Sequence, residues 1–181
     1  PSQDMVLGIY YLTLDKPGDK GEGMFFKDMN EALLAYENGY ITLQAKIKVR
    51  REGINSKGVK EQRIIESTLG RFIFNEVLDQ NLGFVDRSLD ENFLKLEIDF
   101  LVKKKELKQI LEQCMANLGA TRTSEIMDAV KSLGYKYSTI AAMTVSVSDM
   151  TVPPEKAEIL KEAQKKVEII TRNFRKGLLT E

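Results

Sequence analysis

The stretch Ile41-Thr42-Leu43-Gln44-Ala45-Lys46-Ile47-Lys48-Val49-Arg50 alternates between apolar and polar side chains. The odd-numbered residues are apolar, and the even-numbered ones end in Lys46, Lys48 and Arg50, which we call the basic strand face. A period of two is typical of a β-strand with one face in a core and the other in solvent. We therefore expect a half-buried strand over 41–50.

Loops and apolar segments alternate on the C-terminal side of this strand. Residues 51–62 are polar and contain two glycines, so they predict a solvent-exposed loop. Ile64 and Ile65 begin another strand, and Thr68-Leu69-Gly70-Arg71 leads into an apolar helix that ends near Leu78. Residues 79–92 predict a second loop.

The N-terminal side begins with an apolar segment. Residues 4–12 predict either a buried helix, capped by Ser2 or Asp4, or a buried strand, because periodicity does not separate the two. Dense prolines and glycines predict a loop over 15–23, followed by a short strand over 24–26.

A helix is predicted next. Asp28 and Glu31 have the spacing of a capping box, and Gly39 suits the left-handed position after the last turn.

The C-terminal half is predicted to be mainly helical. A first helix over 103–118 is closed by Gly119, and a second over 124–133 is closed by Gly134. Residues 135–147 are rich in tyrosine, threonine and valine, so they predict a strand or extended chain.

The last helix has the clearest signals. Pro153 and Pro154 suit its first turn and Gly177 its C-terminal cap, which makes it about six turns long. Its apolar residues have heptad-like spacing: Ile159, Ala163, Val167, Ile170 and Phe174. This seam needs a partner helix, which we expect to be missing from the chain. The predicted fold is α+β, with small mixed sheets and helices followed by a long protruding helix that forms one arm of a coiled coil.

The composition excludes several classes of function. The 27 basic and 27 acidic side chains cancel, so contacts with nucleic acid or membrane must come from local charge. The chain has no histidine, which argues against stand-alone hydrolytic chemistry and most zinc sites. Its single cysteine, Cys114, lies in an apolar helical stretch and predicts a buried thiol in a reducing compartment.

Two further features concern the location and extent of the chain. No apolar run reaches the roughly 20 residues of a membrane helix, and a signal peptide is not recognisable, so we expect a cytoplasmic protein with no membrane contact. The chain starts at Pro1 without a methionine and stops at Glu181 directly after a helix, which suggests a piece of a longer protein.

Several short motifs, in one order, resemble the β′ subunit family of bacterial RNA polymerases. The first is Pro1-Ser2-Gln3-Asp4-Met5-Val6-Leu7-Gly8-Ile9-Tyr10-Tyr11-Leu12-Thr13, which is similar to the segment after the catalytic aspartate loop. The others are Gly21-Glu22-Gly23-Met24, Glu31-Ala32, Asn38-Gly39, Thr68-Leu69-Gly70-Arg71-Phe72-Ile73-Phe74-Asn75-Glu76, Leu133-Gly134-Tyr135-Lys136-Tyr137-Ser138-Thr139, Asp149-Met150 and Phe174-Arg175-Lys176-Gly177-Leu178-Leu179-Thr180-Glu181. These motifs are distributed along the whole chain, whereas residues 51–62 and 79–92 match only loosely. The sequence departs from the family at Ala142 and Ser146, where relatives often carry glycine.

The resemblance implies a structural section of a DNA-directed RNA polymerase, a nucleotidyltransferase. Residues 1–148 would form the pore domain, and residues 149–181 would begin the funnel domain as the first rim helix. In this family the secondary channel admits nucleoside triphosphates, receives the RNA 3′ end of a backtracked enzyme, and presents its rim to transcript-cleavage and Gre-like or DksA-like factors. No catalytic or metal-binding residue is implied, so the isolated chain should be inactive.

The implied partners and cofactor belong to the whole enzyme. They are the other polymerase subunits (β, α and ω), DNA and RNA. No cofactor is implied in this chain, because the family's magnesium-binding aspartates would lie upstream of Pro1.

Candidate channel-facing residues follow from the resemblance. Gln3 and Asp4 would lie near the active-centre end, where the Gln3 amide could contact a phosphate or ribose, although Asp4 could simply cap a helix. Arg71 could hold a phosphate or pin a neighbouring polymerase domain, or form an intrachain salt bridge. The basic strand face suits non-specific attraction of polyanions, with an ordinary solvated face as the favoured alternative.

Four cations on the last helix could meet acidic patches of a docking factor, or could merely be solvated: Lys161, Lys165, Arg172 and Arg175. The loop carboxylates Asp15 with Asp19, and Asp86 with Asp90, lack a third group, so we reject them as metal or acid–base sites. The main alternative function is a stand-alone coiled-coil interaction module. A third, a small acid–base hydrolase, is opposed by the missing histidine.

Overall fold

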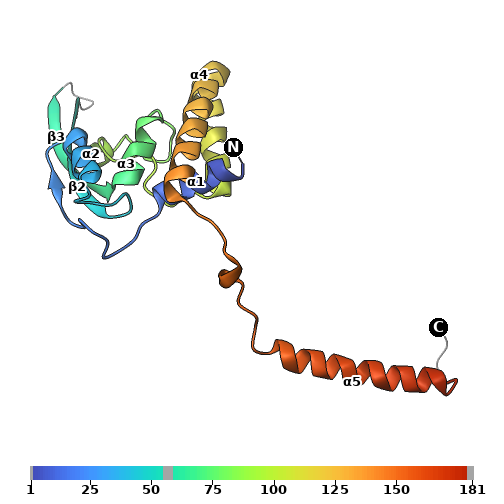
Figure 1. The fold of residues 1–181 in the computed structure, drawn as a ribbon. Helices are drawn as coiled ribbons and strands as arrows, with labels where there is room; N and C mark the ends of the chain where they lie inside the picture. The colour runs from blue at the N-terminus through green and yellow to red at the C-terminus, as the bar shows by residue number, and fades with distance from the viewer. Residues whose placement is uncertain (1, 55–58, 179–181) are drawn as a thin grey trace. The chain divides into compact units, whose positions relative to one another are not determined.

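The computed structural model describes residues 2–54 and 59–178. The chain divides into two compact units, Pro1–Met143 and Thr144–Glu181. Among the described residues, helices and a small three-stranded sheet form the first unit, and one long helix dominates the second (Figure 1). The predicted α+β class is confirmed.

The sheet is built around the central strand β2 (Lys46–Ile54). The short strand β1 (Phe25–Phe26) pairs with it in parallel, and β3 (Lys60–Thr68) pairs with it antiparallel, from Lys46 opposite Thr68 to Ile54 opposite Lys60. Ala45, Ile47 and Val49 are at most 1% exposed, so the predicted apolar face is confirmed.

The predicted loop over 51–62 is wrong for its two ends, because the β2–β3 hairpin continues there. Polar cross-strand partners stabilise this part: the Gln62 amide donates to the Glu52 carboxylate. The pairs are solvent-facing, so their composition resembled a loop. The centre of the predicted loop, 55–58, lies outside the described residues.

Residues 41–45 are not a strand, although Ile41 and Leu43 are buried as predicted. Their backbone and side-chain groups bond to three separate segments instead of one neighbouring strand. The Leu43 carbonyl accepts from the Gly70 amide, the Gln44 carbonyl accepts from the Lys16 amide, and the Gln44 side chain donates to the Tyr11 carbonyl.

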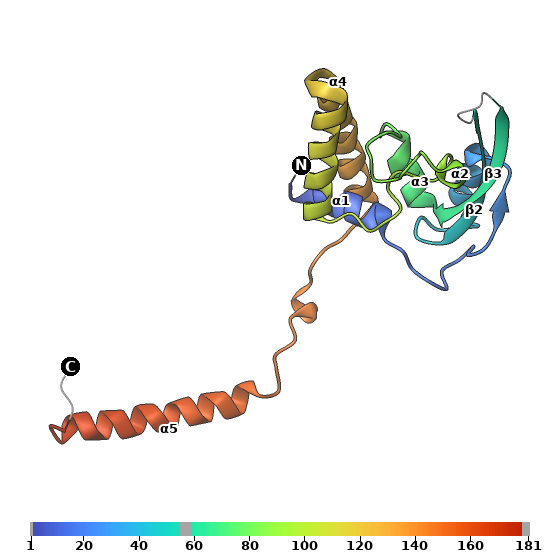
Figure 2. The same ribbon diagram turned by 180° about the vertical axis from the view of Figure 1, so that it is seen from behind.

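Two helices pack beside the sheet, as Figure 2 shows from behind: α2 (Met29–Glu37) and α3 (Leu69–Glu76). The predicted start of α2 is confirmed, since the Asp28 carboxylate accepts from the Glu31 amide at 2.9 Å. Gly39 follows this helix with φ 70°, as expected for a left-handed cap.

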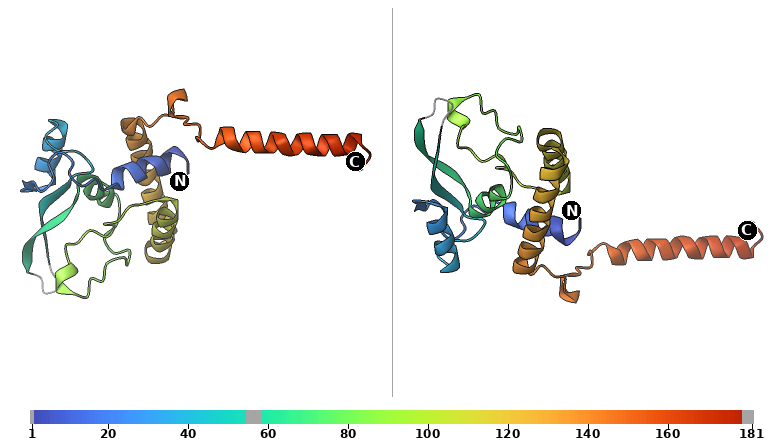
Figure 3. Two further views of the ribbon diagram at one scale, coloured as in Figure 1. Left: turned by 90° about the horizontal axis from the view of Figure 1, so that it is seen from below. Right: turned by 90° about the horizontal axis from the view of Figure 1, so that it is seen from above.

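Residues Asp4–Thr13 form a helix, α1, which decides between the two predicted alternatives. Neither Ser2 nor Asp4 is its cap: the N-cap residue is Gln3, with φ 51° and no side-chain capping bond. Ile9 and Leu12 are fully buried, and α1 lies between α3 and the long helix α4 (Lys104–Ala141), as the views from below and above show (Figure 3).

The contact between α1 and α4 depends on two glycines. A Cβ atom on Gly8 would lie 1.8 Å from the carbonyl oxygen of Gly134, and one on Gly134 would lie 2.6 Å from the carbonyl oxygen of Met5. The prediction that Gly134 ends a helix is therefore wrong. Its missing side chain instead lets two helix backbones touch. On the other side of α1, a Cβ on Gly70 would lie 1.9 Å from the Leu12 carbonyl oxygen.

The helix α4 is interrupted at Gly119, whose φ of 77° and ψ of 175° are not helical. The predicted break at this residue is confirmed. Beyond Gly134 the helix continues to Ala141, so the predicted strand or extended chain over 135–147 is wrong for its first half. Ala142 caps the helix in the left-handed conformation, with φ 47°. Glycine adopts this conformation without the steric cost of a Cβ atom, so a glycine would suit position 142.

The second unit contains a short 3₁₀ turn, η2 (Val147–Asp149), and the helix α5 (Lys156–Arg175). The predicted last helix is confirmed, with Gly177 after it at φ 71°. It begins at Lys156, so Pro153 and Pro154 precede its first turn and do not lie in it as predicted. Its seam is exposed: Ile159, Val167 and Phe174 are 63%, 54% and 49% accessible. No helix within the described residues has the length and apolar character needed to cross a membrane.

Candidate functional site

The predicted site residues of the first unit lie on separate elements. Gln3 and Asp4 begin α1, Arg71 is in the first turn of α3, and the basic strand face lies on β2. Gln3 and Asp4 are exposed. Asp4 stands in the first helical turn, where a carboxylate interacts favourably with the partial positive charge of the helix N-terminus. Their contact with a nucleotide stays a prediction.

Arg71 is a buried structural residue, only 7% exposed. Its Nε donates to the Thr13 carbonyl at 3.1 Å, and its Nη1 lies 3.3 Å from both the backbone and carboxylate oxygens of Asp99. The intrachain salt bridge that we had considered is therefore present. The guanidinium ties the end of α1 to the start of α3 and to the segment around Asp99.

Thr13 completes this junction from the same buried region. Its hydroxyl donates to the Ile9 carbonyl and accepts from the Val102 amide at 3.0 Å. The Ser67 hydroxyl donates to the Asp99 carboxylate. These bonds fix the backbone that enters α4, because Val102 comes two residues before its first turn.

The basic strand face is partly neutralised by nearby carboxylates. Lys46 Nζ lies 3.0 Å from the Asp15 carboxylate, and this hydrogen bond raises the pKa of Lys46. Lys48 Nζ lies 3.9 Å from a Glu66 oxygen. Arg50 is partly exposed on the same face. The Lys48 pair is exposed and the Lys46 pair is partly exposed, so solvent weakens both and a polyanion could compete for the lysines.

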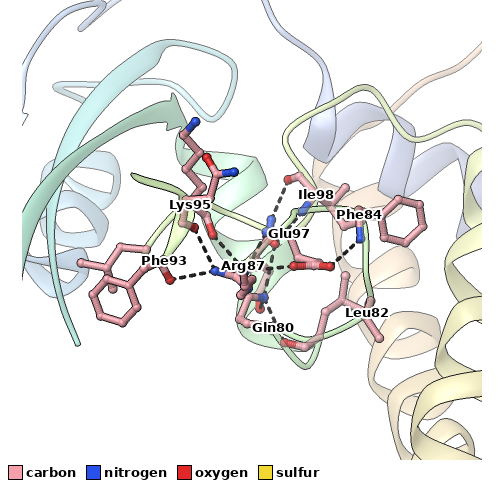
Figure 4. A network of polar contacts seen from close by, with 12 residues as sticks. Gln80, Leu82, Phe84, Arg87, Phe93, Lys95, Glu97 and Ile98 are labelled. Carbon is pink, nitrogen blue, oxygen red and sulfur yellow. Dashed lines mark hydrogen bonds and ion pairs between the residues drawn. The ribbon is translucent and has the colours of Figure 1, made fainter. Parts of the chain in front are cut away.

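A buried polar network is the part of the first unit that the sequence did not indicate (Figure 4). The Glu97 side chain is fully buried, accepts from the Phe84 amide at 2.7 Å, and pairs with Arg87 Nη2 at 2.9 Å. Arg87 Nη1 donates to the carbonyls of Asn92 and Phe93. Arg87 thereby closes the irregular loop between residues 84 and 97 on itself.

Two amides continue the network toward α3. The Gln80 side-chain oxygen accepts from the Glu97 amide, while its nitrogen donates to the Asn75 carbonyl at 3.0 Å. Asn75 in turn bonds both backbone groups of Ile98, donating at 2.7 Å and accepting at 3.0 Å. These bonds substitute for secondary structure in a segment that has only one 3₁₀ turn, η1 (Asp90–Asn92).

The loop carboxylates are engaged in local bonds. The Thr42 hydroxyl donates to Asp19 at 2.8 Å and lowers the pKa of that carboxyl, and the Ser88 hydroxyl does the same for Asp86. Within residues 2–54 and 59–178, acidic, cysteine and histidine side chains form no group of three that could hold a metal ion. Cys114 is buried as predicted, and desolvation raises the pKa of its thiol.

The four cations predicted as docking residues lie on α5 and are exposed: Lys161, Lys165, Arg172 and Arg175. None of them forms an ion pair within the described part of the chain. The last two stand in the final turn of the helix, where cations interact favourably with the helix dipole. Their role in factor docking stays a prediction.

Comparison with known proteins gives consistent matches. The model of the family "RNA polymerase Rpb1, domain 3" matches residues 1–150. A DNA-directed RNA polymerase subunit beta' from Lachnoclostridium phytofermentans is 68% identical over all 181 residues, which are 14% of that relative. Subunits with the same description from Acetivibrio thermocellus and Caldicellulosiruptor saccharolyticus are 51% and 53% identical over the whole chain, which covers 16% of each. The chain thus spans about a seventh of the relatives it matches.

Proposed function

The chain belongs to the family of RNA polymerase Rpb1 domain 3, and from this premise we propose that it acts as a non-catalytic section of a bacterial polymerase β′ subunit. The observation that carries the proposal is the match to β′ subunits over the whole chain, α5 included. The whole subunit would take part in DNA-templated RNA synthesis. The independent coiled-coil module is less favoured, because these relatives carry the segment within a much longer polypeptide.

The first unit would form a wall of the secondary channel. A wall that guides triphosphates and extruded RNA must hold its shape, and three features of the unit support this. Gly8 and Gly134 allow backbone contact between α1 and α4, and Arg71 anchors α1 to α3. Glu97 accepts from the Phe84 amide and so joins the two ends of the irregular segment 84–97. The basic strand face would add weak, non-specific attraction for phosphates, and Gln3 would lie toward the active centre.

Catalysis would depend on residues outside this chain. The magnesium ions of the whole enzyme would be held by aspartates upstream of Pro1, and they would stabilise the charge that develops during phosphoryl transfer. Among the loop carboxylates, Asp19 accepts from the Thr42 hydroxyl and Asp15 pairs with Lys46. This chain would position and shield, without moving protons in the reaction.

The second unit would be the first arm of the channel rim. The exposed seam of α5 supports this, because a helix of 20 residues with such a stripe needs a covering partner. The second arm of an antiparallel coiled coil would cover Val167 and Ile170. The four α5 cations would then face outward, toward transcript-cleavage and Gre-like or DksA-like factors. The other partners would be the β, α and ω subunits, DNA and RNA, in the cytoplasm.

The proposal can be tested with the full-length polypeptide that contains this chain. It should copurify with the other polymerase subunits and support RNA synthesis from a DNA template. In that enzyme, Lys165→Glu combined with Arg172→Glu should reduce factor-stimulated transcript cleavage while RNA synthesis continues. A matched control, Lys136→Glu on α4, should leave both activities unchanged.

Two results would contradict the proposal. If the polypeptide does not copurify with polymerase subunits, its assignment to the enzyme fails. If the enzyme is active but the α5 double variant responds normally to every cleavage factor, the docking role of these cations fails.

A further inference from the structure

An apolar groove lies between the two halves of α4, on the first unit. It has a volume of about 820 Å³. Leu107, Leu111 and Met115 line it from the first half, and Thr123 and Met127 line it from the second. Leu107 and Thr123 are buried, whereas Met115 and Met127 are 51% and 40% exposed. A continuous apolar surface of this kind on a folded unit usually marks an interaction site.

The dimensions of the groove suit a helix. The lining of the first half runs from Lys104 to Met115, which corresponds to about 16 Å of helix, or three turns. Grooves between two helices accept an amphipathic helix through apolar anchors spaced three and four residues apart. The two methionines are flexible and polarisable, so they can adapt to such anchors.

The charge at one end of the groove indicates the chemistry of the occupant. Lys104, Lys105 and Lys108 line this end. They stand in the first two turns of α4, where the helix dipole disfavours cations, so the sequence places positive charge there at a cost to the helix. Lys108 pairs with Glu112 at 3.6 Å. Within the described residues, Lys104 and Lys105 have no ion pair.

We propose that this groove binds an acidic amphipathic helix of a partner polypeptide. The apolar stripe of the helix would pack on Leu111, Met115 and Met127, and its Asp or Glu residues would lie at the end that carries Lys104 and Lys105. The inference is independent of the proposed function, since it depends only on the shape and charge of the groove.

The test uses the full 181-residue chain and two synthetic helical peptides. Both peptides have about 14 residues, long enough for the three turns of the groove, and carry the same leucine stripe. One has glutamates beside the stripe and the other has lysines at the same positions. Binding is measured by fluorescence anisotropy, and the site by NMR of methyl-labelled methionines, of which the chain has seven.

The proposal expects the acidic peptide to bind at least about tenfold more tightly than the basic one. The methyl signals of Met115 and Met127 should shift, and those of Met5 and Met24 should not. Met127→Glu should weaken binding about tenfold or more, because it places a charge in the apolar contact. Ile140→Glu, at a residue of α4 that is 45% exposed and outside the groove lining, is the matched control and should bind normally.

Three results would overturn the proposal. Equal binding of both peptides, or of neither, would remove the acidic helix as the occupant. Shifts that spare Met115 and Met127 would place the binding site elsewhere. A dimer in which these two methyl signals shift without peptide would make a second copy of the chain the occupant. The methyl shifts need no substitution, so the test remains decisive even if Met127→Glu were unstable.

Discussion

Gly8→Ala should destabilise the first unit severely, because it inserts a methyl group where α1 and α4 touch. The Cβ would lie 1.8 Å from the Gly134 carbonyl oxygen and 2.8 Å from the Ser138 nitrogen. An ordinary contact begins near 3.4 Å, so the helices would have to separate by roughly 1.6 Å. That movement would loosen the packing of Ile9 and Leu12, both fully buried.

The expected loss follows from opposing contributions. Alanine in place of glycine favours a helix by about 1 kcal/mol. Overpacking costs about 1–3 kcal/mol, and disturbing buried aliphatic side chains adds about 2 kcal/mol or more. We therefore expect a net loss of about 3 kcal/mol in the free energy of unfolding, a large share of a typical domain's stability of about 5–15 kcal/mol.

The assay is urea unfolding of the full chain, followed by far-ultraviolet circular dichroism. Ser124→Ala, at an exposed position of α4, serves as the matched control and should change stability by less than about 0.5 kcal/mol. If Gly8→Ala were as stable as the parent chain, or more stable, the close crossing of α1 and α4 would be refuted.

Three further changes test other parts of the fold by the same unfolding assay. Ala142→Gly should stabilise the chain by roughly 0.5–1 kcal/mol, because Ala142 is held at φ 47°, and an unchanged or lower stability would argue against that strain. Glu97→Gln should cost about 3 kcal/mol, since it leaves the Arg87 guanidinium without its buried partner, and a loss below about 1 kcal/mol would show that the pair is unimportant. Hydrogen bonding to Arg122 lowers the pKa of Asp79, so this carboxylate contributes stability above its ordinary pKa of 3.8 that is lost as the pH falls through the lower folded-state pKa. Asp79→Asn should therefore reduce the loss of stability below about pH 4, and an unchanged profile of unfolding free energy against pH would exclude this contribution.

Local signals in the sequence predicted the elements that local physics determines. The alternation of Lys46 to Arg50 with apolar residues located the central strand, and the Asp28 carboxylate located the start of α2. Gly39 and Gly177 end helices in the left-handed conformation that glycine favours. Each of these predictions depends on a residue's own backbone or its immediate neighbours.

The failures concern residues whose roles are set by distant partners. Gly134 has the same local signature as a terminal glycine, and only the presence of Gly8 across the crossing shows why it lies inside a helix. The polar hairpin residues near Arg51 and Arg63 resemble a loop until their pairing is known. Glu97 lies in a segment without periodicity, so no pattern could reveal a fully buried carboxylate paired with Arg87.

The candidate site was predicted unevenly for the same reason. Resemblance identified the family, which the match over residues 1–150 confirms. It did not identify which candidates are buried: Arg71 is used inside the first unit, whereas the α5 cations are exposed. Exposure depends on the tertiary fold, which a short motif does not specify.

The most direct test of the central claim is site-specific cross-linking from Val167, with a photoreactive side chain introduced into the full-length polypeptide and the assembled enzyme irradiated. The account predicts an active polymerase in which Val167 cross-links to a second helix of the same polypeptide, the other arm of the rim. Failure to assemble with polymerase subunits, or a cross-link only to an unrelated protein in place of that arm, would contradict it.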